Sequence, residues 1–182
     1  MMNSNWFKLI LKAQRISYGS NLRLKGVPVI VNTKGASLRI GSDVMIKSSF
    51  LSNLVGLYQR TVIVTRTPEA KITIGDHVGM SGVTIYARKE ITIGEYTCIG
   101  GNTKILDNDF HPLDIGERNA DIKEKIAAKP IHIGRNCFIG CNALILKGTI
   151  LGDGCIVGAG AVVAGEFPEN SVIVGNPGKA VS

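Results

Sequence analysis

The sequence predicts an all-β fold in which short strands stack into a triangular solenoid. A six-residue pattern recurs along the 182-residue chain, with Ile, Leu or Val first, Gly usually second and a small residue fifth. Four segments share one template, LRIGSDV, ITIGDHV, ITIGEYT and IHIGRNC, beginning at residues 38, 72, 91 and 131. The composition agrees, because 22 residues are Gly and only 5% are aromatic, which suits a narrow core built from thin layers.

The most regular stretch is a run of five hexads that starts at Ile133. If each hexad makes one short side, three close a coil of 18 residues, so Ile133 should stack on Leu151 and Cys137 on Cys155. Successive coils then pair through backbone hydrogen bonds at about 4.8 Å. The leading aliphatic residue points inward, and Gly permits the backbone geometry of a tight corner. The small fifth residues fit beside the corners; they are Cys137, Ala143, Thr149, Cys155 and Ala161.

The repeat breaks in the stretch ILDNDFHPLD, where a histidine, His111, replaces the expected aliphatic residue. Residues 112–130 lack the hexad pattern and contain two prolines and the charged stretch ERNADIKEKIAAK. We expect a loop of about 19 residues to be ejected from the solenoid here, with one or two helical turns in IKEKIAAK. Long loops in compact repeat folds are often functional.

His111 is the candidate general base. It stands at the root of the ejected loop, and Asp107 and Asp109 are near enough in sequence to orient an imidazole. A histidine with an ordinary pKa of about 6.5 suits this role at neutral pH. A corner histidine that only binds a backbone carbonyl is the alternative. The other histidines, His77 and His132, flank leading Ile residues and are interpreted as surface residues.

The charge and the cysteines narrow the choice of partner. A net charge of +7 favours an anionic partner such as a phosphate-bearing cofactor, an acidic polymer or a membrane surface. No basic block is interleaved with aromatic residues and no helix-turn-helix or zinc-finger spacing occurs, so nucleic-acid binding is not expected. The four cysteines show no C-x-x-C spacing, which indicates reduced thiols in a cytosolic protein.

Residues 1–20 are predicted to form a separate cap, followed by the solenoid domain over residues 21–182. The stretch NWFKLILKAQRISYG can form a helix with Trp6, Ile10, Ala13 and Ser17 near one side. This helix is either a plug over the open end of the solenoid or a basic amphipathic helix at a membrane surface. Neither a secretory signal nor a membrane-spanning helix is expected, because lysines interrupt the first apolar run and none reaches 18 residues.

The hexads resemble those of the hexapeptide-repeat acyltransferases, over about residues 20–181, and the closing segment FPENSVIVGNPGKAV is similar to the usual end of that family. The resemblance implies a left-handed parallel β-helix, a hand that periodicity alone does not give. ILDNDFHPLD resembles the catalytic-histidine segment of maltose and galactoside O-acetyltransferases. It is closer still to the D-x-D-x-H-P form of exopolysaccharide and lipopolysaccharide sugar O-acetyltransferases.

This resemblance implies acetyl transfer from acetyl-CoA to a hydroxyl of a sugar or glycan intermediate, with His111 as base and no metal. An acetyltransferase for an amine, amino acid or antibiotic is the alternative. A groove for CoA needs small residues, which Gly140 and Gly158 supply unless they are merely corners. The resemblance places further CoA contacts at Cys141, Ala159 and Ala164, and a basic partner for the nucleotide phosphates at Lys179.

The acceptor residues depart from the maltose and galactoside pattern. Where those enzymes use an asparagine to hold the acceptor, this chain has Ser81 and Gly82, and Tyr86 follows as a further candidate sugar contact. The acceptor is therefore expected to differ from a simple disaccharide. The zinc set of γ-type carbonic anhydrases, which share the solenoid, is missing, since Leu106 and Gly116 stand where a second histidine would be needed.

The resemblance also implies an assembly. The family works as trimers, with each active site between two subunits and the ejected loop reaching across. We therefore expect a homotrimer in the cytoplasm, with contact at the inner face of the membrane as a further option.

Overall fold

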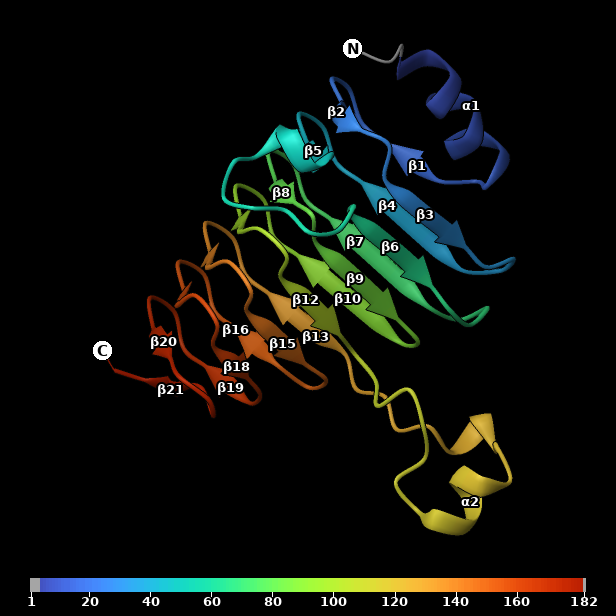
Figure 1. Ribbon diagram of the computed structural model, residues 1–182, viewed down its shortest axis with the longest axis vertical. Coiled ribbons are helices and arrows are strands. Elements are labelled where there is room, and N and C mark those ends of the chain that lie inside the picture. The colour runs from blue at the N-terminus through green and yellow to red at the C-terminus, as the bar shows by residue number, and fades with distance from the viewer. Residues whose placement is uncertain (1–3, 182) are drawn as a thin grey trace.

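The computed structural model describes residues 4–181, without the side chains of residues 4–6 and 8. The predicted fold is confirmed: the chain is a left-handed parallel β-helix whose three sheets form the sides of a prism (Figure 1). We call these sheets A, B and C, in the order in which the chain visits them.

Sheet A contains β1 (Ser17–Tyr18), β4 (Ser37–Ile40), β7 (Lys71–Ile74), β10 (Glu90–Ile93), β13 (Ile131–Ile133), β16 (Ile150–Leu151) and β19 (Glu166–Phe167). Sheet B contains β2 (Arg23–Gly26), β5 (Met45–Ser48), β8 (Gly79–Ser81), β11 (Cys98–Ile99), β14 (Phe138–Ile139), β17 (Ile156–Val157), β20 (Val172–Val174) and β21 (Lys179–Ala180). Sheet C contains β3 (Val29–Asn32), β6 (Val62–Thr65), β9 (Thr84–Ala87), β12 (Lys104–Leu106), β15 (Leu144–Leu146) and β18 (Val162–Val163).

The register confirms the predicted coil. Ile133 pairs with Leu151, and the pairing of Phe138 with Ile156 sets Cys137 beside Cys155. The leading aliphatic residues point into the prism and are at most 3% exposed. The small fifth residues are buried as well, since none of the five exceeds 2% exposure. Aliphatic side chains stacked in columns therefore form the core.

The repeated glycine serves a purpose other than the predicted one. The glycine that follows the leading Ile is not in the left-handed region. Two residues later, in the same corner, this conformation falls on residues such as His77 and Asn136, with φ of 59° and 55°. A Cβ on Gly75 would instead lie 2.6 Å from the backbone nitrogen of Glu95 on the next coil. The repeat needs glycine because adjacent coils approach too closely for any side chain.

The ejected loop leaves the solenoid between β12 and β13 and projects away from it (Figure 1). Its base is a short antiparallel neck, in which the N–H of Lys129 donates to the carbonyl of Asp107 at 2.9 Å and Asn108 bridges to Ala128. Beyond the neck lie two short helical elements, α2 (Ile115–Asn119) and the 3₁₀ turn η2 (Lys123–Lys125). The strand register is unchanged across the insertion, since Ile91 pairs with Ile131.

Helix α1 (Ser4–Ala13) covers the end of the first coil. Phe7 and Leu11, four residues apart, are buried in the solenoid core at 5% and 0% exposure. Of the residues predicted on one side of the helix, Ile10 packs partly buried against the core and Ala13 is exposed, while the Trp6 side chain lies outside the described residues. The larger side chains of Phe7 and Leu11 bury more apolar surface and so set the orientation. Nothing helical within residues 4–181 has the length and apolar character needed to cross a bilayer.

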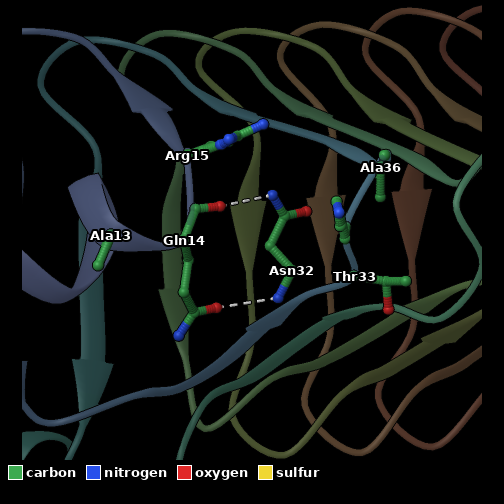
Figure 2. Close-up of a pocket in the computed structure, with 8 residues that line it drawn as sticks. Ala13, Gln14, Arg15, Asn32, Thr33 and Ala36 are labelled. Carbon is green, nitrogen blue, oxygen red and sulfur yellow. Dashed lines mark hydrogen bonds between the residues drawn. The ribbon is translucent and has the colours of Figure 1, made fainter.

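Two side chains join this cap to the first coil (Figure 2). The backbone N–H of Asn32 donates to Gln14 Oε1 at 2.9 Å, and Asn32 Nδ2 donates to the Gln14 carbonyl at 2.9 Å. Beside them is a cavity of about 290 Å³ lined by residues 13–15 and 32–36. This cavity lies at the cap, on the first coil, and the candidate site residues belong to later coils.

Candidate active site

The candidate site residues lie at the two corners that flank sheet C, one at each end of its strands. We call the residues that join sheet B to sheet C the B–C corner (82–83, 100–103, 140–143 and 158–161). The residues that join sheet C back to sheet A are the C–A corner (107–130, 147–149 and 164–165). From Asn102 to Asp107 the chain runs five residues along one strand, a span of about 16 Å.

His111 is exposed at the C–A corner, on the far side of a three-residue turn. Its N–H donates to the carbonyl of Asp109 at 2.7 Å, and the central residue Phe110 has a φ of +64°. This i to i+2 hydrogen bond with a positive central φ is the rare form of the γ-turn, which is strained for a residue with a side chain. The backbone thus presents the imidazole outward from the neck of the loop.

Two neighbours hold this turn in place. The side chain of Asn108 accepts a hydrogen bond from the Phe110 N–H at 2.9 Å. The Phe110 ring packs against Tyr86 of β9, with ring centroids 4.8 Å apart and an interplanar angle of 48°. Tyr86 therefore lies at the same corner as His111, and the pair forms an aromatic surface beside it.

The Asp107 side chain binds backbone N–H groups of the preceding coil. Its carboxylate is fully buried and accepts hydrogen bonds from the N–H groups of Arg88, Lys89 and Glu90 at 2.7 to 3.0 Å. Asn108 Nδ2 donates to it as well, at 3.0 Å. Both oxygens are thus engaged in shaping the corner between β9 and β10, which leaves Asp109 as the better placed partner for the His111 ring.

Asp109 pairs with a lysine of the next coil. Its Oδ1 forms an ion pair with Lys147 Nζ, and the two side chains are 17% and 29% exposed. Its Oδ2 is buried and has no hydrogen-bond partner among the described residues. Lys147 was absent from the sequence-based site, and its hexad position gave no signal, because Arg135 and Asp153 occupy the same position in other hexads.

The candidate coenzyme residues gather at the other edge of sheet C. Gly140 and Cys141 follow β14, Gly158 and Ala159 follow β17, and so these four lie at the B–C corner. Lys179, in β21, pairs with Val174 at the end of β20, which is the B–C end of the last coil. The Lys179 side chain is exposed. Ala164 is the exception, because it follows β18 and lies at the C–A corner.

Ser81 and Gly82 also lie at the B–C edge, away from His111 in the same chain. The irregular segment 49–61, which includes the 3₁₀ turn η1 (Phe50–Ser52), folds over them. Asn53 donates to the Ser81 hydroxyl at 3.1 Å, and Gln59 donates to the Gly82 carbonyl at 2.7 Å. Asn102 fixes the same segment by accepting from the Tyr58 N–H at 3.2 Å and donating to the Gly56 carbonyl at 3.0 Å.

The other histidines lie away from these corners on sheet A or its exit. His77 is exposed and stacks on Tyr96, with ring centroids 4.5 Å apart, so its interpretation as a surface residue is confirmed. His132 is half-buried and its Nδ1 lies 2.8 Å from the Thr92 hydroxyl. Over residues 4–181, His, Cys, Asp and Glu side chains form no group of three arranged to hold a metal ion.

Comparison with known proteins identifies the repeat. Residues 130–164 match the family model described as the hexapeptide repeat of succinyl-transferase. Residues 130–164 of this chain therefore carry the hexapeptide repeat.

Solved structures share the fold of this chain. A variant of AntD, an N-acyltransferase from Bacillus cereus in complex with dTDP and coenzyme A, aligns with a TM-score of 0.72 and 19% identity, over 96% of this chain and 87% of AntD. A galactoside acetyltransferase in complex with coenzyme A aligns with a TM-score of 0.57 and 20% identity, over 100% of this chain and 72% of that one. At these identities the likeness establishes the fold.

Curated relatives match part of this chain. A candidate acetyltransferase of Schizosaccharomyces pombe is 38% identical over 91 residues, which is 50% of this chain and 42% of that protein. WbbJ of Escherichia coli K12, described as a candidate lipopolysaccharide biosynthesis O-acetyl transferase, is 30% identical over 116 residues, or 60% of this chain and 56% of WbbJ. The chain thus spans about half the length of these relatives.

Proposed function

We propose that this protein transfers an acetyl group from acetyl-CoA to a hydroxyl of a sugar or glycan intermediate. The observation that carries the proposal is the exposed His111, presented by a strained turn whose first residue is a partly buried, ion-paired carboxylate. Its supports are the similarity to WbbJ and the shared fold of coenzyme A-bound acyltransferases.

In the proposed reaction His111 takes the proton of the acceptor hydroxyl as the oxygen attacks the thioester carbonyl. A tetrahedral oxyanion forms and collapses, the C–S bond breaks, and the imidazolium returns the proton to the departing CoA thiolate. Asp109 is the group placed to orient the imidazole and to face its positive charge. The transfer is direct, so it requires neither a covalent acetyl-enzyme nor a metal.

The site is proposed to form between two subunits of a homotrimer. Within one chain, sheet C separates the C–A corner, which carries His111, from the small residues of the B–C corner, so a single subunit presents two separate halves. Exposed apolar side chains also gather on sheet B and the 49–61 segment, where a neighbouring chain can bury them. They are Leu51, Leu54, Phe138, Ile156 and Val174, with exposures of 84%, 88%, 53%, 42% and 40%.

In this arrangement the B–C corner of one subunit holds CoA through Gly140, Cys141, Gly158 and Ala159, and Lys179 faces its phosphates. Tyr86 and Phe110 of the other subunit offer an aromatic surface for the acceptor beside His111. Because acetyl-CoA is a cytoplasmic metabolite, the proposed reaction takes place in the cytoplasm.

The test is an acetyl-transfer assay that follows free CoA release and acceptor mass. Free sugars, nucleotide-linked sugars, lipid-linked glycans and the corresponding amino sugars form the acceptor panel. We expect an O-acetylated product, and His111→Ala should lower kcat by at least about 100-fold while CoA binding persists. A folded variant with wild-type kcat would contradict the role of His111, and turnover of amino sugars alone would support N-acetyl transfer instead.

A further inference from the structure

We propose that Lys147 is a positioning residue that acts on the candidate base through Asp109. This inference rests on the proposed acetyl transfer, because it requires His111 to accept a proton. Lys147 occupies the third position of the hexad ILKGTI, which the repeat pattern does not specify, and it lies outside the D-x-D-x-H-P segment.

Lys147 reaches Asp109 from a rigid support. It directly follows β15, which pairs residue by residue with β12, so that Leu146 lies beside Leu106. The lysine is thus carried by the coil adjacent to the one from which the loop departs. At 29% and 17% exposure, the two side chains meet where water competes little for either charge. Such a pair fixes its geometry more firmly than an ion pair in open solvent.

Asp109 is held at every polar atom except one. Its N–H donates to the Ala127 carbonyl at 3.1 Å, its own carbonyl accepts from the His111 N–H, and its Oδ1 pairs with Lys147. The exception is Oδ2, which is buried and lacks a partner among the described residues. A buried carboxylate oxygen without a donor is costly, and so it calls for a donor in the working state.

The His111 ring is the donor that the chain supplies. It is exposed and two residues away across the γ-turn. In the proposed working state its ring turns toward Oδ2. With Oδ1 fixed by Lys147, Oδ2 can receive only a narrow range of ring orientations. Without Lys147, the carboxylate rotates and is left as an unneutralised charge. Lys147 thereby selects the ring orientation in which the opposite nitrogen faces the acceptor.

The experiment compares Lys147→Met with two other variants. Loss of positioning should lower kcat by about 10- to 100-fold and leave the KM for acetyl-CoA near its wild-type value. Lys147→Arg, which keeps a cation for Asp109, should recover much of the loss. Arg135→Met is the matched control: Arg135 and Asp153 also join adjacent coils, at 2.6 Å, but at an exposed corner after sheet A. Its kcat should equal that of the wild type.

A second measurement separates positioning from stability. In a His111→Ala background, Lys147→Met should lower kcat no further, because a residue that acts through His111 has nothing left to orient. A purely structural lysine would reduce kcat by the same factor in both backgrounds, in step with its thermal unfolding midpoint. If Lys147→Met does not fold, Lys147→Gln is measured in its place.

The outcomes are distinct. If wild-type protein transfers acetyl groups and Lys147→Met behaves like Arg135→Met, the Lys147 proposal is overturned and the proposed function stands. A loss of equal size in the His111→Ala background also overturns it. If wild-type protein transfers no acetyl group to any acceptor, the proposed function fails first, and the positioning role fails with it.

Discussion

The C–A corner and the B–C corner lie at opposite ends of the same strands of sheet C and differ in almost every other respect. The C–A corner carries ionisable groups, a strained turn and an ejected loop. The B–C corner carries small residues and left-handed asparagines, such as Asn102 and Asn142 with φ of 62° and 57°, and is covered in part by the 49–61 segment. The corner with ionisable groups is thus separate from the corner with small residues.

This contrast shows how a solenoid can carry different chemical properties at different corners. Because each coil returns to the same corner, one property can be repeated along an edge, and small residues recur at the B–C corner from Gly101 to Gly160. A candidate catalytic side chain instead needs a position that occurs only once along the solenoid. The His111 turn occurs once because the repeat is broken there.

The largest expected effect tests whether the two edges cooperate across subunits. His111→Ala removes the base at one edge, and Ala159→Trp obstructs the exposed small-residue corner at the other. Each variant alone should be nearly inactive. After co-refolding, random mixing in a cyclic assembly should restore about a quarter of the wild-type activity. Recovery is measured as acetyl-transfer rate per subunit; a mixture as inactive as its components would mean that each chain works alone.

A second prediction separates structure from chemistry within the C–A corner. Asp107→Asn weakens charged hydrogen bonds to the backbone of residues 88–90, so we expect a loss of about 2 kcal/mol and a fall in Tm of about 5 °C. Differential scanning calorimetry gives the shift. Asp153→Asn, which alters an exposed ion pair, is the control and should leave Tm almost unchanged. A normal Tm for Asp107→Asn, together with a loss of kcat as large as that of His111→Ala, would instead show that Asp107 takes part in catalysis.

The smallest effect concerns the B–C edge. Lys179 is exposed, so a phosphate contact there acts as a screened point charge. Lys179→Ala should raise the KM for acetyl-CoA a few-fold, leave kcat nearly unchanged, and lose its effect at high ionic strength. Initial rates at two salt concentrations measure this, with Lys34→Ala, a lysine beside the distant cap cavity, as the matched control. An unchanged KM at both concentrations would remove Lys179 from the site.

The sequence predicts the coils because each hexad encodes its own side of the prism. Ile133, Cys137 and Leu151 occupy their expected positions, since the spacing alone sets which residues stack. The same logic covers the coils before residue 50, where the template is weaker but the inward positions, such as Leu38 and Ile46, remain aliphatic. The burial of Phe7 and Leu11 was not predicted, because contacts with the first coil, rather than helical periodicity, determine which side of α1 is buried.

Side-chain partnerships at the corners could not be predicted in the same way. Lys147 meets Asp109 only because the insertion after Asp107 preserves the register between β12 and β15, which pairs residues far apart in the chain. The roles of Asp107 and Asp109 also look alike in ILDNDFHPLD. Their difference depends on which carboxylate faces the turn at Arg88 and which faces the neighbouring coil.

The antiparallel neck of the ejected loop has a consequence for how such proteins diversify. Asp107 with Lys129 and Asn108 with Ala128 close the base of the loop. Beyond this neck, Asp109, Phe110 and the Lys123 carbonyl still contact the coils, through Lys147, Tyr86 and Arg88. Sequence changes elsewhere in the tip can therefore leave the core and these contacts intact. Under the proposed function, such changes would alter the acceptor preference while the His111 turn is kept.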